Sequence, residues 1–289
     1  MTELELLHRL ELKVALEIVN VCKKNGLHCF LIFGSLLGAV RHNGFIPWDD
    51  DLDIAMPRKD YENFIQVFQD QTDSDVFFLE NWDTEPEFGL TLSKVKLNHT
   101  IFEEHSISKT NTHKGIFVDV FPLDCIPDDE KKLKKTALRL QWLGSLYKFR
   151  MNYLPTDPKN RKQHIYSKLM GTVAHLIPQK TIRKWLIKEE TRYNTDPSAM
   201  LTTFLSGAYR CRDAFNKSFL NEIIEHEFEG EYLPIPARYD EILTKIYGDY
   251  MTLPPEEKRV FRHSAERIDF GPYKNKLGGK NDTDTSLCE

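Results

Sequence analysis

The spacing of hydrophobic positions differs between the first and second halves of the chain. Between residues 3 and 24 apolar side chains recur at helical spacing, so we expect an amphipathic helix that ends at Gly26. Five short apolar runs predict strands, at 28–33, 51–56, 76–80, 90–97 and 115–121. A further helix is expected after Pro57, so the first 125 residues predict a mixed α/β domain.

After Pro127 helical spacing predominates. Helices are expected from residue 128 onward and at 162–177, 179–194 and 236–248. We therefore expect a core of residues 1–127, a mainly helical region of residues 128–273, and a polar tail of residues 274–289 that is disordered. The expected fold class is α/β (α+β), a mixed sheet with flanking helices and a largely helical C-terminal half.

Composition narrows the class of protein. A chain of 289 residues with 40% hydrophobic and 11% aromatic residues can build a sizeable core. The acidic, amphipathic N-terminus is not the pattern of a signal peptide, and no stretch reaches the roughly 20 apolar residues of a membrane span. Five scattered cysteines without CxxC spacing suggest reduced thiols. We therefore expect a cytoplasmic protein.

Charge is distributed unevenly. Residues 131–192 carry 16 Lys and Arg against three acids, whereas the rest of the chain holds 23 basic and 41 acidic residues. The basic segment suggests an anionic partner, either a lipid surface or a phosphorylated substrate, and we expect no nucleic acid. The alternative is a solvated, lysine-rich helical face.

The most unusual motif is an acidic run, in which Asp49, Asp50, Asp51 and Asp53 directly precede apolar residues. If residues 51–56 are extended, Asp51 and Asp53 share one face of a strand, about 7 Å apart. Such a pair suits a hard divalent cation, Mg²⁺ or Mn²⁺. Asp49 and Asp50 would lie just ahead of the strand, where they orient the pair or are solvated.

Two other features fit the same chemistry. Gly34-Ser35 follows an apolar run, and such a turn can place a backbone N–H and a hydroxyl against a phosphate. Asp119 stands alone in the apolar run GIFVDVF, where an unpaired carboxylate would be costly, so we expect it to meet a metal or to act as a base. The alternative is a turn or cap cluster, which explains Asp49 and Asp50 well but Asp53 poorly.

Together these residues resemble the nucleotidyltransferase fold and, more closely, the LicD family of phosphocholine transferases and fukutin-related proteins. The resemblance is carried by FGSLLGAVRHNGFIPWDDDLDIAM (33–56), GIFVDVFPLD (115–124) and YLPIPARYDEILTKIYGDYMTLPPEEKRVFRH (232–263). Residues 128–230 match only loosely. The resemblance implies a nucleotidyltransferase-like sheet, with Asp51 and Asp53 as the metal-binding pair and Asp119 as a third acid, either ligand or base.

The resemblance also implies an activity. It is the transfer of a phospho-alcohol, phosphocholine from CDP-choline above all, to a sugar hydroxyl of a cell-surface glycan or its lipid-linked precursor, with release of CMP, as in lipopolysaccharide or teichoic acid biosynthesis. CDP-ribitol, CDP-glycerol and CDP-ethanolamine remain alternative donors. Two competing hypotheses are a nucleotidyltransferase that releases pyrophosphate from an NTP and a non-catalytic binding module. The basic segment 131–192 would hold the enzyme at the inner membrane face or at its acceptor.

Several other residues are candidates for substrate contacts. We expect Arg41, Lys94 and Lys96 to contact donor phosphates, the alternative being surface charge. Trp48 and Trp82 could enclose a quaternary ammonium, the alternative being core packing. His263 could bind a phosphate or the acceptor, although a lone histidine is more often structural.

Overall fold

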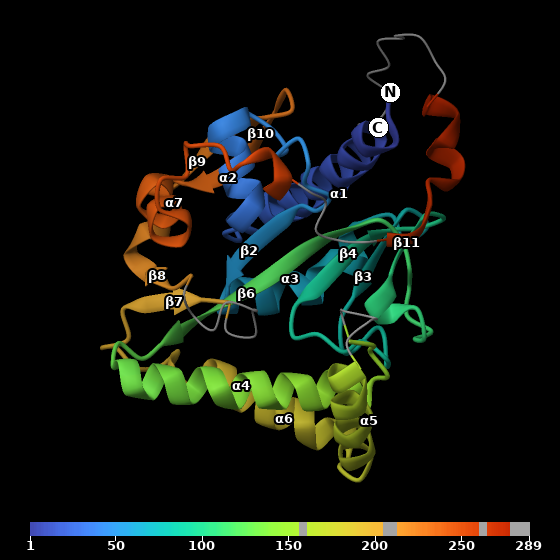
Figure 1. The fold of residues 1–289 in the computed structure, drawn as a ribbon. Helices are drawn as coiled ribbons and strands as arrows, with labels where there is room; N and C mark the ends of the chain where they lie inside the picture. Colours follow the sequence, from blue (N-terminus) through green and yellow to red (C-terminus); the bar gives the residue numbers. More distant parts are fainter. Residues whose placement is uncertain (156–160, 205–212, 260–264, 278–289) are drawn as a thin grey trace.

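A mixed β-sheet forms the centre of the molecule (Figure 1). The structure is a computed structural model that describes residues 1–155, 161–204, 213–259 and 265–277. The sheet order is β1 (Phe30–Leu31), β2 (Asp53–Pro57), β6 (Phe117–Ile126), β4 (Ser93–Leu97) and β3 (Phe77–Glu80). β2 and β6 run parallel, and the other pairs are antiparallel. This sheet confirms the predicted fold class.

Two helices cover one face of the sheet. α1 (Glu3–Asn25) begins with a capping box between Thr2 and Glu5 and ends at Gly26, whose φ of 64° suits glycine. α3 (Arg58–Gln71) contacts α1 as well as β2, β3 and β6. The apolar side of α1 packs into the main core, as its sequence periodicity predicts. A shorter helix, α2 (Phe33–His42), connects β1 to the loop that leads into β2.

The basic segment forms a separate helical layer below the sheet in Figure 1. It consists of α4 (Glu130–Arg150), α5 (Arg161–His175) and α6 (Gln179–Glu190). These helices share their own buried cluster around Leu140, Leu146, Tyr147, Ile182 and Leu186. Among the described helices, none combines the length and apolar character that crossing a membrane requires.

The C-terminal segment returns to the beginning of the chain. β9 (Ile223–Phe228) and β10 (Glu231–Pro236) form a hairpin, and α7 (Tyr239–Tyr247) packs on α2. Phe228, Leu233 and Leu243 are buried in the same cluster as α1 and the sheet. Further pairings add β7 (Leu201–Thr203) to the end of β6, β8 (Phe215–Asn216) to β7, and β11 (Ala265–Asp269) to β5 (Ile101–Glu104).

Most predicted elements are confirmed, with four corrections. The strand expected at 28–33 is reduced to Phe30–Leu31, because α2 already begins at Phe33, and the strand expected from 51 begins at Asp53. The region 128–273 is helical only in part, since β7 to β11 follow the helical layer. β7 and β11 are short and pair with β6 and β5, far away in sequence, whereas β9 and β10 form a local hairpin that the sequence analysis missed. In the tail predicted to be disordered, residues up to Leu277 belong to a 3-10 helix (Gly271–Leu277), and residues 278–289 lie outside the described part.

The predicted division of the chain at residue 127 stays a prediction. The helical layer begins close to it, at Glu130. Residues of β9, β10 and α7, however, complete the core of the first part. Both halves of the sequence therefore contribute to the main core.

Candidate active site

The loop between α2 and β2 carries the acidic run and is held from two sides. On one side, the Phe45 backbone N–H donates to the Glu229 carboxylate at 3.0 Å, and the Glu229 N–H donates to the Asn43 carbonyl at 2.9 Å. On the other side, the His8 ring of α1 stacks on Phe45 with centroids 3.9 Å apart, and its Nε2 lies 2.8 Å from the Asp49 carbonyl oxygen. The hairpin and α1 together therefore fix the position of the acids.

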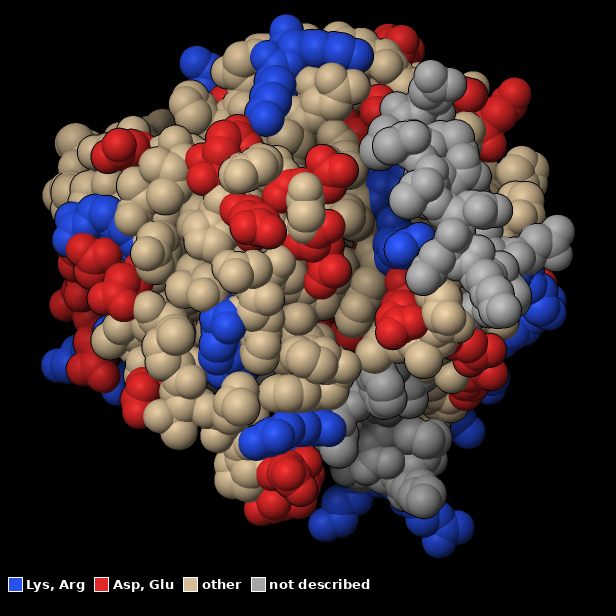
Figure 2. Space-filling view, turned by 90° about the horizontal axis from the view of Figure 1, so that it is seen from above, with Lys and Arg blue, Asp and Glu red and all other residues tan. Residues whose placement is uncertain are grey.

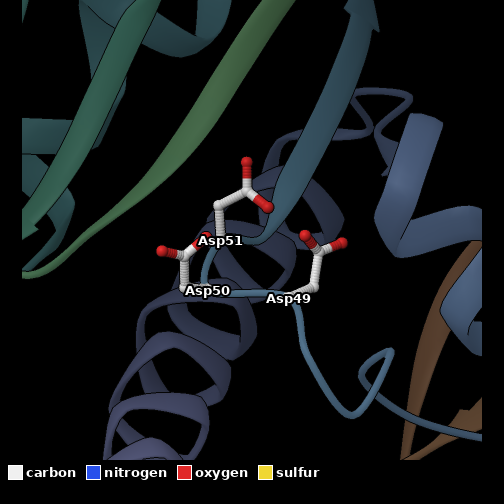
Figure 3. A group of neighbouring side chains, drawn as sticks. All are labelled: Asp49, Asp50 and Asp51. Carbon is white, nitrogen blue, oxygen red and sulfur yellow. The ribbon is translucent and has the colours of Figure 1, made fainter. Parts of the chain in front are cut away.

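Asp49, Asp50 and Asp51 form one cluster at the end of this loop (Figure 3). Each offers a carboxylate oxygen, and the three oxygens lie within 4.8 Å of one another. The side chain of Asp49 also accounts for the glycine at position 34 in α2, because a Cβ there would lie 2.7 Å from Asp49 Oδ2. Asp50 is only 5% exposed, so of the two expectations for it, simple solvation is wrong.

Asp53 and Asp119 lie side by side on the two parallel strands. They are register partners in the β2–β6 pairing, so their side chains leave the same face of the sheet. The Ser35 hydroxyl accepts the Asp53 backbone N–H at 2.8 Å, which links α2 to the beginning of β2. Burial, followed by the nearby Asp51 and Asp119, raises the pKa of Asp53 well above its ordinary value.

Lys94 of β4 completes this part of the sheet. It is the register partner of Asp119, and its Nζ lies 2.9 Å from Asp119 Oδ1 and 3.9 Å from Glu104. Burial lowers the pKa of Lys94, but the neighbouring Asp119 and Glu104 outweigh burial and raise it overall. Lys94 is therefore a buried cation that orients Asp119.

Sequence reasoning missed Glu11 of α1, a further carboxyl group at this site. Its side chain is 2% exposed and interacts electrostatically with the four acids Asp51, Asp50, Asp49 and Asp119. Burial, followed by these acids, raises the pKa of Glu11 well above its ordinary value. A signal was present, because Glu11 interrupts the apolar stripe of Leu4, Leu7, Val14 and Ile18.

This set of side chains fits a divalent cation. Five aspartates and Glu11 lie near one another, and of these acids Asp119 is the one that pairs with the buried ammonium of Lys94. Carboxylate oxygens are the ligands that Mg²⁺ and Mn²⁺ prefer. Figure 2 shows acidic side chains at the centre of the face seen from above, with Lys and Arg side chains beside them. The assignment of Asp51, Asp53 and Asp119 as ligands stays a prediction. Asp49 and Asp50 lie next to Asp51 in the same cluster.

The other predicted cations have different surroundings. Lys96 pairs with Glu80 at 2.7 Å, and both side chains are almost fully buried, so this ammonium already has a structural partner. Arg41, at the end of α2, donates to the Tyr250 carbonyl at 2.8 Å. Arg259, which the sequence patterns did not single out, lies over the Trp48 ring at 5.4 Å, although it belongs to the third block of the resemblance.

The two candidate tryptophans belong to different surroundings. Trp48, next to the acidic cluster in sequence, contacts His42 and Arg259. Trp82 packs instead on Tyr147 and Arg183 of the helical layer. Their ring contacts share no residue, so these contacts do not join them into one aromatic box. His263 lies outside the described residues.

The site thus lies on a mixed sheet with acids on neighbouring strands, next to a helix that begins with Gly34 and Ser35 in its first turn. Residues 26–160 match the model of the LicD/FKTN/FKRP nucleotidyltransferase domain, so this part of the chain is a LicD-family domain. Over 261 residues the chain is 28% identical to the lipopolysaccharide cholinephosphotransferase LicD of Haemophilus influenzae, and the match covers 85% of this chain and 90% of that protein.

Two further similarities are shorter. Uncharacterised proteins of Rickettsia typhi and Rickettsia prowazekii are 40% and 39% identical to this chain over 67 residues. Each match covers 21% of this chain, and it covers 22% and 25% of the two relatives, respectively.

Proposed function

We propose that the protein is a metal-dependent transferase that moves phosphocholine from CDP-choline to a sugar hydroxyl of a glycan or its lipid-linked precursor and releases CMP. The similarity to a lipopolysaccharide cholinephosphotransferase over 85% of the chain supports phosphocholine transfer. The observation that carries the proposal is the placement of Asp53 and Asp119 as register partners beside the Asp49–Asp51 cluster. Phosphoryl transfer needs such charge for positioning a cation and its phosphates more than it needs a covalent nucleophile.

The residues have defined roles in this reaction. The acceptor hydroxyl oxygen bonds to the phosphorus that carries choline, the bond from that phosphorus to the CMP oxygen breaks, and the hydroxyl proton leaves to a base. A divalent cation held by Asp51, Asp53 and Asp119 would neutralise charge on the phosphates. Asp119 is either a ligand or the base, and Lys94, 2.9 Å away, holds its carboxylate in place.

Product identity tests the proposal. The purified chain is incubated with Mg²⁺, an acceptor glycan and CDP-choline, and CMP and the choline-bearing product are followed by chromatography. A parallel reaction with NTPs is followed for pyrophosphate. We expect CMP release that depends on both the acceptor and Mg²⁺ and that stops in EDTA. Pyrophosphate formation without CMP release from CDP-choline would favour a nucleotidyltransferase.

The alcohol is the least constrained part of the proposal. The ring contacts of Trp48 and Trp82 form no complete box for a quaternary ammonium, and Trp48 next to the acids is the remaining candidate. A panel of CDP-choline, CDP-ethanolamine, CDP-glycerol and CDP-ribitol in the same assay identifies the alcohol. We expect the highest kcat/KM with CDP-choline, and a preference for another donor would change the alcohol while leaving the reaction class intact.

We further propose that the helical layer contacts the anionic lipid surface that carries the acceptor. α5 exposes Ile165, Leu169 and Val173 at helical spacing, and Leu176 follows its last residue; these four side chains are between 43% and 82% exposed. Exposed basic side chains accompany them on α5 and α6, among them Lys162, Lys168, Lys184 and Lys188. Exposed apolar side chains with neighbouring lysines are typical of helices that bind anionic membrane surfaces.

A further inference from the structure

We propose that Glu11 is a further acidic residue of the cation site, so that α1 is a functional part of the enzyme. This inference rests on the cation in the proposed function. α1 precedes residues 26–160, the part of the chain that matches the LicD-family model. The cation site would therefore extend beyond that part of the chain.

The position of Glu11 is defined by the contacts of α1. His8 is one helical turn earlier on the same side of the helix, and its Nε2 lies 2.8 Å from the Asp49 carbonyl oxygen. Figure 3 shows the loop with the three aspartates crossing directly over α1. The Glu11 carboxyl group is close enough to Asp49, Asp50, Asp51 and Asp119 to interact with each of them. Glu11 therefore lies beneath the cluster and approaches it from the helix side.

One oxygen of the Glu11 carboxyl group is left without a partner in the described part of the structure. This oxygen is Oε2, and it is buried. A buried carboxyl group without a full set of partners costs free energy, and an apolar side chain would continue the stripe of Leu7, Val14 and Ile18 without that cost. Interaction with other acids makes its ionised form still less favourable. A divalent cation among these acids reverses the sign of that interaction and gives the carboxylate a function.

Metal affinity tests this inference without reference to catalysis. Mn²⁺ is titrated into the full chain without donor or acceptor, and the free ion is measured by electron paramagnetic resonance. Glu11→Gln keeps the shape and removes the charge, and we expect it to weaken Mn²⁺ binding about 10-fold to 100-fold, the range seen when a supporting residue of a metal site is replaced. Glu17→Gln, on the same helix but outside the acidic cluster, is the matched control and should bind Mn²⁺ as the wild type does.

A second variant separates function from stability. Glu11→Leu completes the apolar stripe, so we expect a higher Tm than wild type in EDTA and a smaller rise in Tm on adding Mg²⁺. If Glu11 were only a structural hydrogen-bond donor, Glu11→Gln would bind Mn²⁺ within about twofold of wild type and Glu11→Leu would have a lower Tm. Either result, or a wild-type protein that binds no Mn²⁺, overturns the inference. Failure of the CMP assay alone would leave the Mn²⁺ result standing and would count only against the proposed reaction.

Discussion

Buried charged residues are arranged differently at the two ends of the parallel strands β2 and β6. Where β2 begins, Asp53 and Asp119 stand side by side, with three further aspartates and Glu11 close by. At the other end, Arg58 follows β2, and its guanidinium donates to both carboxylate oxygens of Asp124 on β6. The end where β2 begins has an excess of acids, whereas at the other end the cation Arg58 is in direct contact with its acids.

The second end is a structural junction. Arg58 also lies 3.2 Å from Glu190 at the end of α6, and Asn194 donates to Asp124 at 2.7 Å. Burial lowers the pKa of Arg58, but the bonds to Asp124 outweigh burial and raise it. These contacts join the sheet to the helical layer. Paired charge therefore serves the fold here, whereas at the beginning of β2 the acids outnumber Lys94, and this excess of acids is the feature on which the proposed cation site rests.

The largest expected effect comes from removing charge at the acidic end. The double variant Asp51→Asn, Asp53→Asn should lower CMP release by about three orders of magnitude or more, because it removes charge stabilisation of the transition state. The same change should raise Tm in EDTA, because it removes buried like charges. Activity and stability thus move in opposite directions, which a general loss of folding would not produce.

The control for this variant is Asp75→Asn, at an exposed position before β3. It should leave both CMP release and Tm close to wild type. Wild-type rates of CMP release from the double variant would show that Asp51 and Asp53 do not hold the reacting cation, and the assignment of the site would be wrong.

Replacing Arg58, at the other end of β2, should mainly change the stability of the protein. Arg58→Met leaves Asp124 and Glu190 buried without their cation, so we expect the free energy of unfolding to fall by about 3–5 kcal/mol, the range for breaking one side of a buried ion pair. Urea denaturation followed by circular dichroism measures this change. Lys59→Met, at the exposed neighbouring position, is the control. A loss below about 1 kcal/mol would place Arg58 among ordinary surface ion pairs.

The pH dependence of stability should distinguish the two ends further. The raised pKa of Asp53 means that the folded protein keeps this proton after the unfolded chain has released it. The protonated Asp53 side chain therefore makes its whole contribution to stability below the unfolded pKa of about 3.9. This contribution is lost as pH rises toward the folded pKa. In EDTA, the stability of Asp53→Asn relative to wild type should increase as pH rises above about 4. Saturating Mg²⁺ should reduce this difference, and a difference that stays constant from about pH 4 to about pH 8 would contradict the prediction.

Local patterns in the sequence predicted much of the fold and part of the site. The apolar stripe of α1 and the alternation around Asp53 are visible within a few residues. The pairing of Asp53 with Asp119, and of Arg58 with Asp124, depends on the register of two strands that are 66 residues apart in the chain. Glu11 could have been noticed as a carboxylate in an apolar stripe, but only the packing of α1 under the loop shows what it faces. Tertiary register is therefore the information that the single sequence lacked.

The smallest expected effects concern the outer face of the helical layer. The wild type should sediment with vesicles containing phosphatidylglycerol and not with pure phosphatidylcholine vesicles, and binding should weaken with salt. Lys168→Gln should weaken binding by about 1 kcal/mol, which is about fivefold, because one cation near an anionic surface contributes that much. Leu176→Ser should weaken it by a comparable amount, since its 82% exposed side chain would insert only partly.

The matched control for the lipid surface is Lys24→Gln, which removes the same charge from an exposed position on α1. If the helical layer is the contact face, this variant binds vesicles as the wild type does, and CMP release from a water-soluble acceptor is unchanged in all three variants. Equal losses from Lys24→Gln and Lys168→Gln would mean that binding follows net charge alone and that α5 has no special role. Loss from Lys168→Gln and Leu176→Ser alone would assign the two regions different tasks, with cation chemistry at the acidic end and attachment at the helical layer.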